Sequence, residues 1–260
     1  MDLLFYIVAG AGVGFAVGVT GVGGGSLMTP LLIFSGVPEK IAIGTDLLYA
    51  AITKTGGMWS HKRLGTIKWR IVLLLGAGSI PSAFLTAYFL SKLGNYDYSD
   101  ILSTALGVML ILTSVTLLLK SRLRKKDLPA EANSNDLWYY RHADGLTVSA
   151  GICLGVFVTL SSVGAGAFCA MLLFTLYPRM PALHVVGTDI AHAVPLTFIG
   201  GMAHFLLLGN IDWALLGGLL IGSLPAVHLG ALFATRIPNN ILQPTLAVIL
   251  LVIGLKFLFF

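Results

Sequence analysis

The chain has 260 residues, of which 57% are hydrophobic and only 10% are charged, and its formal net charge is +5. Soluble domains contain about 25% charged residues, so this composition excludes an ordinary soluble protein and indicates one embedded in lipid. The basic residues gather in two short loops beside apolar segments, which membrane topology explains better than nucleic-acid binding. Cys153 and Cys169 lie in an apolar window without metal-ligand spacing, so we interpret them as packing residues and expect no metal.

The first half of the chain contains five apolar segments, each expected to be a helix. A helix that crosses the hydrocarbon needs about 20 apolar residues. Asp2 stands where a secretory signal peptide would carry a basic residue, so we expect the first segment to stay in the protein. The segments are Leu3–Thr20, Ser26–Gly36, Ile41–Ser60, Ile71–Leu90 and Ile101–Leu119.

The second of these segments is too short to cross a membrane by itself. Ser26–Gly36 has 11 residues, and a helix of that length spans about 16 Å of a hydrocarbon core about 30 Å thick. The glycine-rich run Val22–Gly25 precedes it. Non-helical backbone is tolerated at membrane depth only where protein or a wet cavity surrounds it. We therefore predict that the first two segments form a re-entrant hairpin whose glycine tip stops inside the membrane.

The remaining chain is predicted to be a basic linker followed by five more segments. The linker is residues 120–144, and its basic residues are Lys120, Arg122, Arg124, Lys125, Lys126 and Arg141. The later segments are Leu146–Leu160, Ala167–Tyr177, Val185–Leu208, Trp213–Thr235 and Ile241–Leu258. The second of them is again too short to cross. We thus divide the chain into a first membrane repeat (1–119), the linker (120–144) and a second membrane repeat (145–260).

The two halves share motifs in the same order, which indicates an internal duplication. Glycine, proline and aspartate match in register, whereas chance similarity between apolar segments would match leucine and valine. The matched motifs are Gly44-Thr45-Asp46 with Gly187-Thr188-Asp189, Gly78-Ser79-Ile80-Pro81 with Gly222-Ser223-Leu224-Pro225, and Val22-Gly23-Gly24-Gly25 with Val163-Gly164-Ala165-Gly166.

The matched loops after the third segments differ in charge, and this difference predicts their orientation. The first loop carries Lys62, Arg63, Lys68 and Arg70, while its counterpart around Asp212 has no Lys or Arg. Cytoplasmic loops collect Lys and Arg, so the first loop is expected inside and the second outside. The fold class is then an all-α integral membrane protein of two inverted-topology repeats. The linker is expected to be cytoplasmic, both termini outside, and the location the cell (inner) membrane.

Inverted repeats with interrupted helices are typical of secondary transporters, whose substrate site lies at the repeat interface near the midplane. The two tips are therefore the first candidates, because the N-termini of the short helices favour an anion. The alternative is that these glycines only permit close helix packing. The candidate substrate-binding residues are Thr20, Gly23, Gly24, Gly25, Ser26, Thr45, Ser161, Ser162, Gly164, Gly166, Thr188 and His192.

Three charged residues within the apolar segments are candidates for coupling or charge pairing: Asp46, Asp189 and Lys54. A charge at the centre of a membrane helix costs about 2.5–3.5 kcal/mol. For Asp46 three interpretations stay open: an interfacial carboxylate at the helix start, a proton-coupling group, or a partner of Lys54 or a histidine. Lys54 either attracts an anion, pairs with an aspartate or extends to the cytoplasmic face. For His192, ligand or proton contact competes with simple packing.

The glycine tip with its Pro-ended short helix (Gly21–Pro30), the run Ala42–Thr45, the Gly-x-Ile turn and the duplicated second half together resemble the TauE/SafE sulfite-exporter family. The resemblance covers nearly the whole chain. It implies transport of small sulfur-containing anions such as sulfite, sulfoacetate or other sulfonates, outward and with protons as a candidate coupling ion. The second tip departs from the pattern, because Ala165 replaces its middle glycine.

These features favour a secondary transporter that acts by alternating access on a small anion. An anion channel of the same architecture is the first alternative. An intramembrane enzyme is the second, although the chain has no His-Glu-x-x-His and no Gly-x-Ser-x-Gly motif. The expected partners are the anion, the lipid bilayer and, in the coupled alternative, protons. We expect no cofactor and no catalytic residue, and the sequence leaves the oligomeric state open.

Overall fold

The computed structural model describes residues 3–20, 25–93, 97–123, 136–234 and 239–259, and the regular structure within these ranges is entirely helical. This confirms the predicted all-α class. The helices are α1 (Leu3–Thr20), α2 (Gly25–Phe34), α3 (Glu39–Arg63), α4 (Trp69–Lys92), α5 (Ser99–Leu123), α6 (Asp136–Ser161), α7 (Ala167–Leu176), α8 (Ala182–Ala203) with the π-helical turn η1 (His204–Leu208), α9 (Trp213–Ala234) and α10 (Asn239–Phe259).

Hydropathy located the helices well because burial in lipid, rather than in a water-surrounded core, decides where they form. Within the described ranges, five helices are long and apolar enough to cross a membrane: Trp69–Lys92, Ser99–Leu118, Ala143–Ser161, Ala182–Leu208 and Trp213–Phe233. Helix α3 is as long but carries charges in its interior. The two short segments are also present, since α2 and α7 have 10 residues each.

The structure extends one helix into the predicted linker. Helix α6 begins at Asp136, ten residues before the predicted start at Leu146. A helix needs apolar side chains only while it lies in lipid, and polar residues can continue it beyond that depth. The hydropathy pattern therefore marks the membrane-embedded part of α6 and not its first hydrogen-bonded turn.

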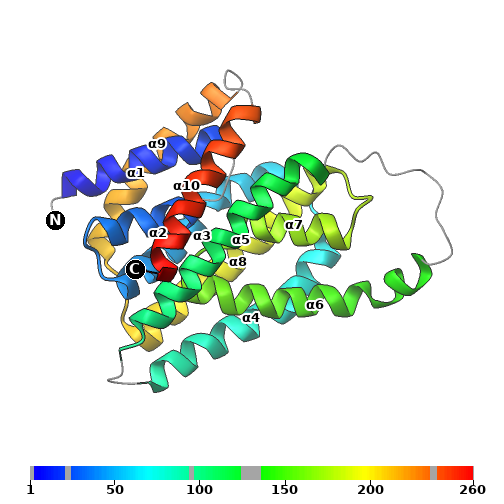
Figure 1. Cartoon of the computed structure of the whole chain (residues 1–260), viewed down its shortest axis with the longest axis horizontal. Coiled ribbons are helices and arrows are strands. Elements are labelled where there is room, and N and C mark those ends of the chain that lie inside the picture. The colour runs from blue at the N-terminus through cyan, green and yellow to red at the C-terminus, as the bar shows by residue number, and fades with distance from the viewer. Residues whose placement is uncertain (1–2, 21–24, 94–96, 124–135, 235–238, 260) are drawn as a thin grey trace.

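The helices pack in pairs that cross between the two halves of the chain. In Figure 1, α1 lies along α9 and α4 lies along α6, and these two pairs have the most extensive contacts in the structure. The next most extensive contacts join α5 to α10 and α3 to α8. Neither half forms a separate unit, because each contributes one helix to every one of these four pairs.

Glycine allows the α1–α9 and α4–α6 pairs to approach closely. A Cβ atom added at Gly222 of α9 would lie 1.9 Å from the carbonyl oxygen of Ile7 in α1. One added at Gly78 of α4 would lie 2.2 Å from the carbonyl oxygen of Val148 in α6. Membrane helices associate through such small residues, because lipid provides no hydrophobic drive between them. Gly78 and Gly222 therefore serve the close packing of these helices.

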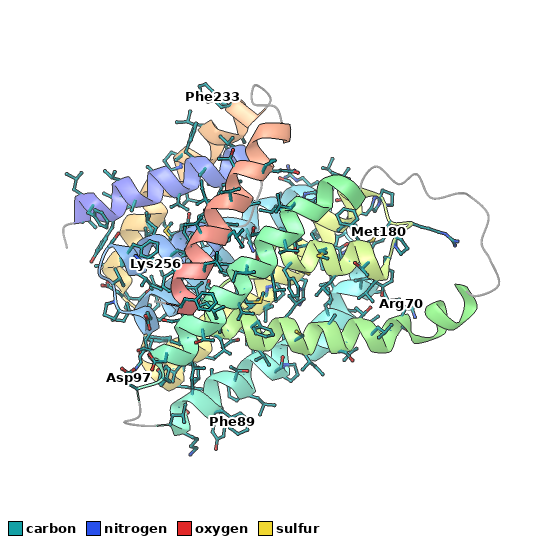
Figure 2. The ribbon with its side chains drawn as sticks, viewed as in Figure 1. Arg70, Phe89, Asp97, Met180, Phe233 and Lys256 are labelled. Atoms are coloured by element: carbon teal, nitrogen blue, oxygen red, sulfur yellow. The ribbon has the colours of Figure 1, made fainter. Side chains whose placement is uncertain are left out.

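The start of α1 and the end of α10 lie at the opposite end of the bundle from the end of α5 and the start of α6. In Figure 1 the start of α1 and the end of α10 lie toward the left, whereas the end of α5 and the start of α6 lie toward the right. Figure 2 shows Arg70 and Met180 at the same end as the α5 and α6 termini, and Asp97 at the other. Arg70, in the first turn of α4, thus lies at the same end of the bundle as the end of α5 and the start of α6.

The end of the bundle that carries the termini holds an ion pair at its surface. The Lys40 ammonium lies 2.9 Å from Asp97 and 4.2 Å from the centre of the Tyr98 ring. Its hydrogen bond, together with those from Ser99, lowers the pKa of Asp97 to about 2. A carboxyl group with a lowered pKa stabilises the fold above its ordinary pKa of about 4, and this contribution is lost as the pH falls toward 2.

We expect Asp97→Asn to have a small effect, because the Asp97 side chain is exposed and surface ion pairs contribute little. At neutral pH its melting temperature in detergent should lie within about 3 °C of the wild type, and this difference should shrink at about pH 3. Scanning fluorimetry at both pH values measures it. A loss of about 10 °C or more would instead show that this pair holds the bundle end together.

Candidate functional site

Helices α3 and α8 pack on each other and carry the two copies of the Gly-Thr-Asp motif. The ten consecutive residues Ala42–Ala51 of α3 are all buried. Asp46 is fully buried, and Asp189 of α8 is only 6% exposed. Both carboxylates are therefore shielded from solvent by the surrounding helices. Charged groups at such positions need partners or a function.

The Gly-Thr part of the first copy binds the loop between η1 and α9. A Cβ atom at Gly44 would lie 2.3 Å from the carbonyl oxygen of Asn210, so only glycine lets this loop rest on α3. The Asp212 amide then donates a hydrogen bond to the Thr45 hydroxyl at 3.1 Å.

The second copy binds the loop between α3 and α4 in the same way. A Cβ atom at Gly187 would lie 2.7 Å from the Thr66 hydroxyl, and the Lys68 amide donates to the Thr188 hydroxyl at 3.0 Å. Both predicted threonines thus bind backbone amides of loops. A substrate contact is not needed to explain Thr45 or Thr188.

The second tip, residues 161–166, consists of Ser161, the last residue of α6, and a largely buried stretch of irregular backbone that leads to α7. Ser162 has a φ of +58° and Gly164 a φ of +118°, and the second value is one that glycine adopts readily. The Ser161 hydroxyl accepts a bond from the Val163 amide at 3.1 Å and donates one to the Phe157 carbonyl at 2.6 Å. Ser161 therefore holds the tip in shape, and the neighbouring Ser162 Oγ, which is also buried, makes no hydrogen bond.

Lys54 brings a positive charge to this tip. Its ammonium donates a hydrogen bond to the carbonyl oxygen of Ala165, and the side chain is partly buried. The carboxylates of Asp189 and Asp46 both act electrostatically on this ammonium, Asp189 more strongly. The Lys54 side chain therefore reaches the second tip and lies near both aspartates.

Asp46 lies beside the opposite part of the same tip. The Thr29 hydroxyl of α2 donates a 2.5 Å hydrogen bond to Asp46 Oδ2. The Ser162 hydroxyl faces the same carboxylate, although not in hydrogen-bonding geometry, and Asp46 Oδ1 makes no hydrogen bond. The tip is therefore flanked by an acidic group at Ser162 and a basic group at Ala165.

Cys169, in the first turn of α7, connects Asp189 to His192. Its thiol faces the Asp189 carboxylate, and its sulfur lies 3.9 Å from Nδ1 of His192. Nε2 of the same imidazole lies 2.8 Å from the Ser79 hydroxyl of α4. His192 is fully buried, and its two ring nitrogens lie next to Cys169 of α7 and Ser79 of α4.

The remaining candidates lie at the first tip. Gly23 and Gly24 fall outside the described residues, as do the side-chain surroundings of Thr20 and Gly25. Ser26, in the first turn of α2, is buried. Among the sequence candidates, the structure therefore gathers Asp46, Lys54 and Asp189 around the second tip.

Three residues of this cluster were not candidates from the sequence. Thr29 and Ser79 are neutral residues within apolar helices, and only their three-dimensional neighbours show that they bind Asp46 and His192. Cys169 was interpreted as packing, yet its thiol contacts two polar groups. The sequence feature that could have identified Cys169 is its position in the first turn of the short helix α7, directly after the second tip. Within the described residues, no three His, Cys, Asp or Glu side chains are placed to hold a metal ion.

Comparison with known proteins identifies a transporter family and relatives named as probable membrane transporters. The family model described as "Sulfite exporter TauE/SafE" matches residues 6–257. The chain is 39% identical to the "Probable membrane transporter protein YjnA" of Bacillus subtilis over 96% of the chain and 97% of that protein. It is 25% identical to "Probable membrane transporter protein YfcA" of Escherichia coli, with 100% of the chain and 90% of that protein covered. No solved structure matches the chain.

Proposed function

The chain belongs to the TauE/SafE sulfite exporter family, and from this premise we propose that it is a secondary transporter of small organosulfur anions such as sulfite, sulfoacetate or other sulfonates. The family and the relatives named above are membrane transporters, not enzymes, and the chain is a multi-pass membrane protein. The finer proposal is export by alternating access, with a substrate site between two inverted repeats.

The repeat proposal rests on matched sequence motifs and matched contacts. Helix α1 of the first repeat packs on α9 of the second, and the corresponding α6 packs on α4. The hydroxyls of Thr45 and Thr188 each bind a loop amide from the other half. These contacts are what a two-fold relation between residues 1–119 and 145–260 would produce, and transporters are commonly built in this way.

The proposed orientation has the linker 120–144 in the cytoplasm and both termini outside an inner membrane. The Lys- and Arg-rich loop before α4 supports it, as does the location of that loop and of the α5 and α6 termini at one end of the bundle.

The observation that carries the anion proposal is the bond from Lys54 to the second tip. Placing a lysine ammonium against irregular backbone inside a membrane bundle costs free energy, so such a residue usually has a function. An anion there would meet the ammonium, the unbonded Ser162 hydroxyl and the positive end of α7. The proposed site therefore comprises Lys54, Ser162, Gly164 and Gly166; the first tip, whose glycines Gly23 and Gly24 fall outside the described residues, stays a sequence prediction.

Flux measurements on purified protein in liposomes test this function. We expect saturable movement of ³⁵S-labelled sulfite or isethionate, at least about 10-fold above protein-free liposomes, with turnover in the range of about 1–1000 s⁻¹ that is usual for catalysed steps. Counterflow against unlabelled substrate should accelerate it. Absence of flux for every sulfite or sulfonate would exclude the proposed substrates. Flux far above that turnover, without counterflow, would identify a channel.

A further inference from the structure

Resting on the proposed function, we infer that the site carries a monovalent anion together with one proton, which the Asp46 and Asp189 carboxylates take up while Lys54 remains the counter-charge of the anion. The inference comes from the charges that the structure brings around the second tip.

The groups that face these charges come from five parts of the structure. Asp46 faces Thr29 of α2, Tyr49 and Lys54 of its own helix, and Ser162 of the tip. Lys54 faces Asp46, Asp189, Cys169 and His192. Asp189 faces Cys169 of α7 as well as Lys54. The ionic groups of the cluster are therefore one ammonium and two carboxylates, and their neighbours are hydroxyl, thiol and imidazole groups.

One ammonium and two ionised carboxylates carry a net charge of −1. Inside a membrane protein an uncompensated charge is disfavoured, and the empty site becomes neutral when one of the two carboxylates holds a proton. A monovalent anion adds a further −1. The occupied site is neutral again only when the second carboxylate is also protonated. Anion binding is thus linked to the uptake of one proton, and the loaded site stays uncharged.

The same count disfavours a divalent anion. Once both carboxylates are protonated, Lys54 alone faces the substrate, and a divalent anion leaves a net charge of −1 in the cluster. A monovalent sulfonate such as isethionate should therefore be carried better than sulfoacetate, which has two ionised groups at neutral pH. We expect isethionate flux to exceed sulfoacetate flux by about 100-fold at equal concentration, the ratio that one unpaired charge at membrane depth implies.

Asp46 Oδ1 and Ser162 Oγ offer a place for the proton at the tip. Both atoms are buried, neither makes a hydrogen bond, and the Ser162 hydroxyl faces this carboxylate. A proton on Oδ1 would turn this acceptor into a donor directed at a hydroxyl acceptor, which gives two unsatisfied atoms a partner. Asp189 in turn faces the Cys169 thiol.

The experiment measures proton and anion movement together. Liposomes containing the full chain and a trapped pH-sensitive dye receive an inward gradient of ³⁵S-isethionate. A sulfonate is used because its charge stays fixed, whereas sulfite takes up a proton near neutrality. We expect one proton to move with each isethionate, in the same direction. A potential set with valinomycin and potassium should leave the flux unchanged. Isethionate flux without proton movement, or flux that follows the potential or a sodium gradient, would overturn the inference while leaving the transport function intact.

A paired substitution gives a second, independent test. Asp46→Asn with Asp189→Asn removes both proton acceptors, so isethionate counterflow should persist while its pH dependence, about tenfold per pH unit in the wild type at most, disappears. Asp100→Asn, at the exposed start of α5, is the matched carboxylate control and should retain the coupling. Unchanged coupling in the double variant would overturn the inference. If the double variant does not fold, the wild-type stoichiometry decides alone.

Discussion

Lys54→Gln is expected to lower isethionate or sulfite flux by at least about 100-fold, the largest functional effect of any single change in this chain. The substitution keeps a group that can donate to the Ala165 carbonyl and removes only the charge. An anion at the second tip would then leave a net charge of −1 in the site even with both carboxylates protonated. The two carboxylates can protonate to keep the empty site neutral, so the fold should survive. Flux in liposomes, with elution on size-exclusion chromatography as the folding check, measures the change.

Lys256→Gln is the matched control for this prediction. Lys256 also lies in an apolar helix, α10, and its ammonium sits 4.4 Å from the centre of the Phe34 ring. Removing this charge should change flux by less than about threefold, because a single exposed cation–π contact contributes little. Equal losses in the two variants would show that lysine charges act on the bundle generally, and retained flux in Lys54→Gln would remove Lys54 from the site.

Gly222→Ala is expected to produce the largest loss of stability. Its Cβ atom would lie 1.9 Å from the Ile7 carbonyl oxygen and 2.8 Å from the Ala11 amide nitrogen. Both are backbone atoms that cannot rotate away, so α1 and α9 must separate. We expect a loss of about 3 kcal/mol, near the upper end for overpacking, and a fall of roughly 10 °C in melting temperature.

Gly217→Ala provides the control in the same helix. No atom lies within 4 Å of a Cβ atom at Gly217, and alanine is the better helix former. This variant should be as stable as the wild type or slightly more stable. Thermal unfolding followed by size-exclusion chromatography compares the pair. Similar melting temperatures for the two variants would mean that the α1–α9 contact is looser than the structure has it.

The sequence predicted the helices because a membrane requires apolar length, and length can be counted. The same counting identified α2 and α7 as too short to cross. Counting apolar residues did not locate the start of helix α6, because its first turns lie outside the apolar segment. Hydropathy also does not predict which side chains contact each other. Lys54 and Ala165 are 111 residues apart, and Thr45 and the Asp212 amide are 167 apart.

The charges within the helices were visible from sequence, but not their arrangement. An intramembrane Asp or Lys signals a task or a partner, which made Asp46, Asp189 and Lys54 candidates. Thr29 gave no such signal, because a threonine can bond to its own helix and needs no external partner. Thr45 and Thr188 were included as repeated polar residues, and the structure explains their repetition by loop attachment. The first tip remains a prediction.

The pairing of α1 with α9 also bears on how the chain is made. Helix α1 is synthesised before its partner α9, and about 190 residues separate the end of α1 from the start of α9. At about 5–20 residues per second, α1 waits on the order of 10–40 s before α9 is synthesised. Helix α6, by contrast, finds α4 already in the bilayer. The glycine face of α1 must therefore be sheltered by lipid or by the insertion machinery until α9 has been synthesised.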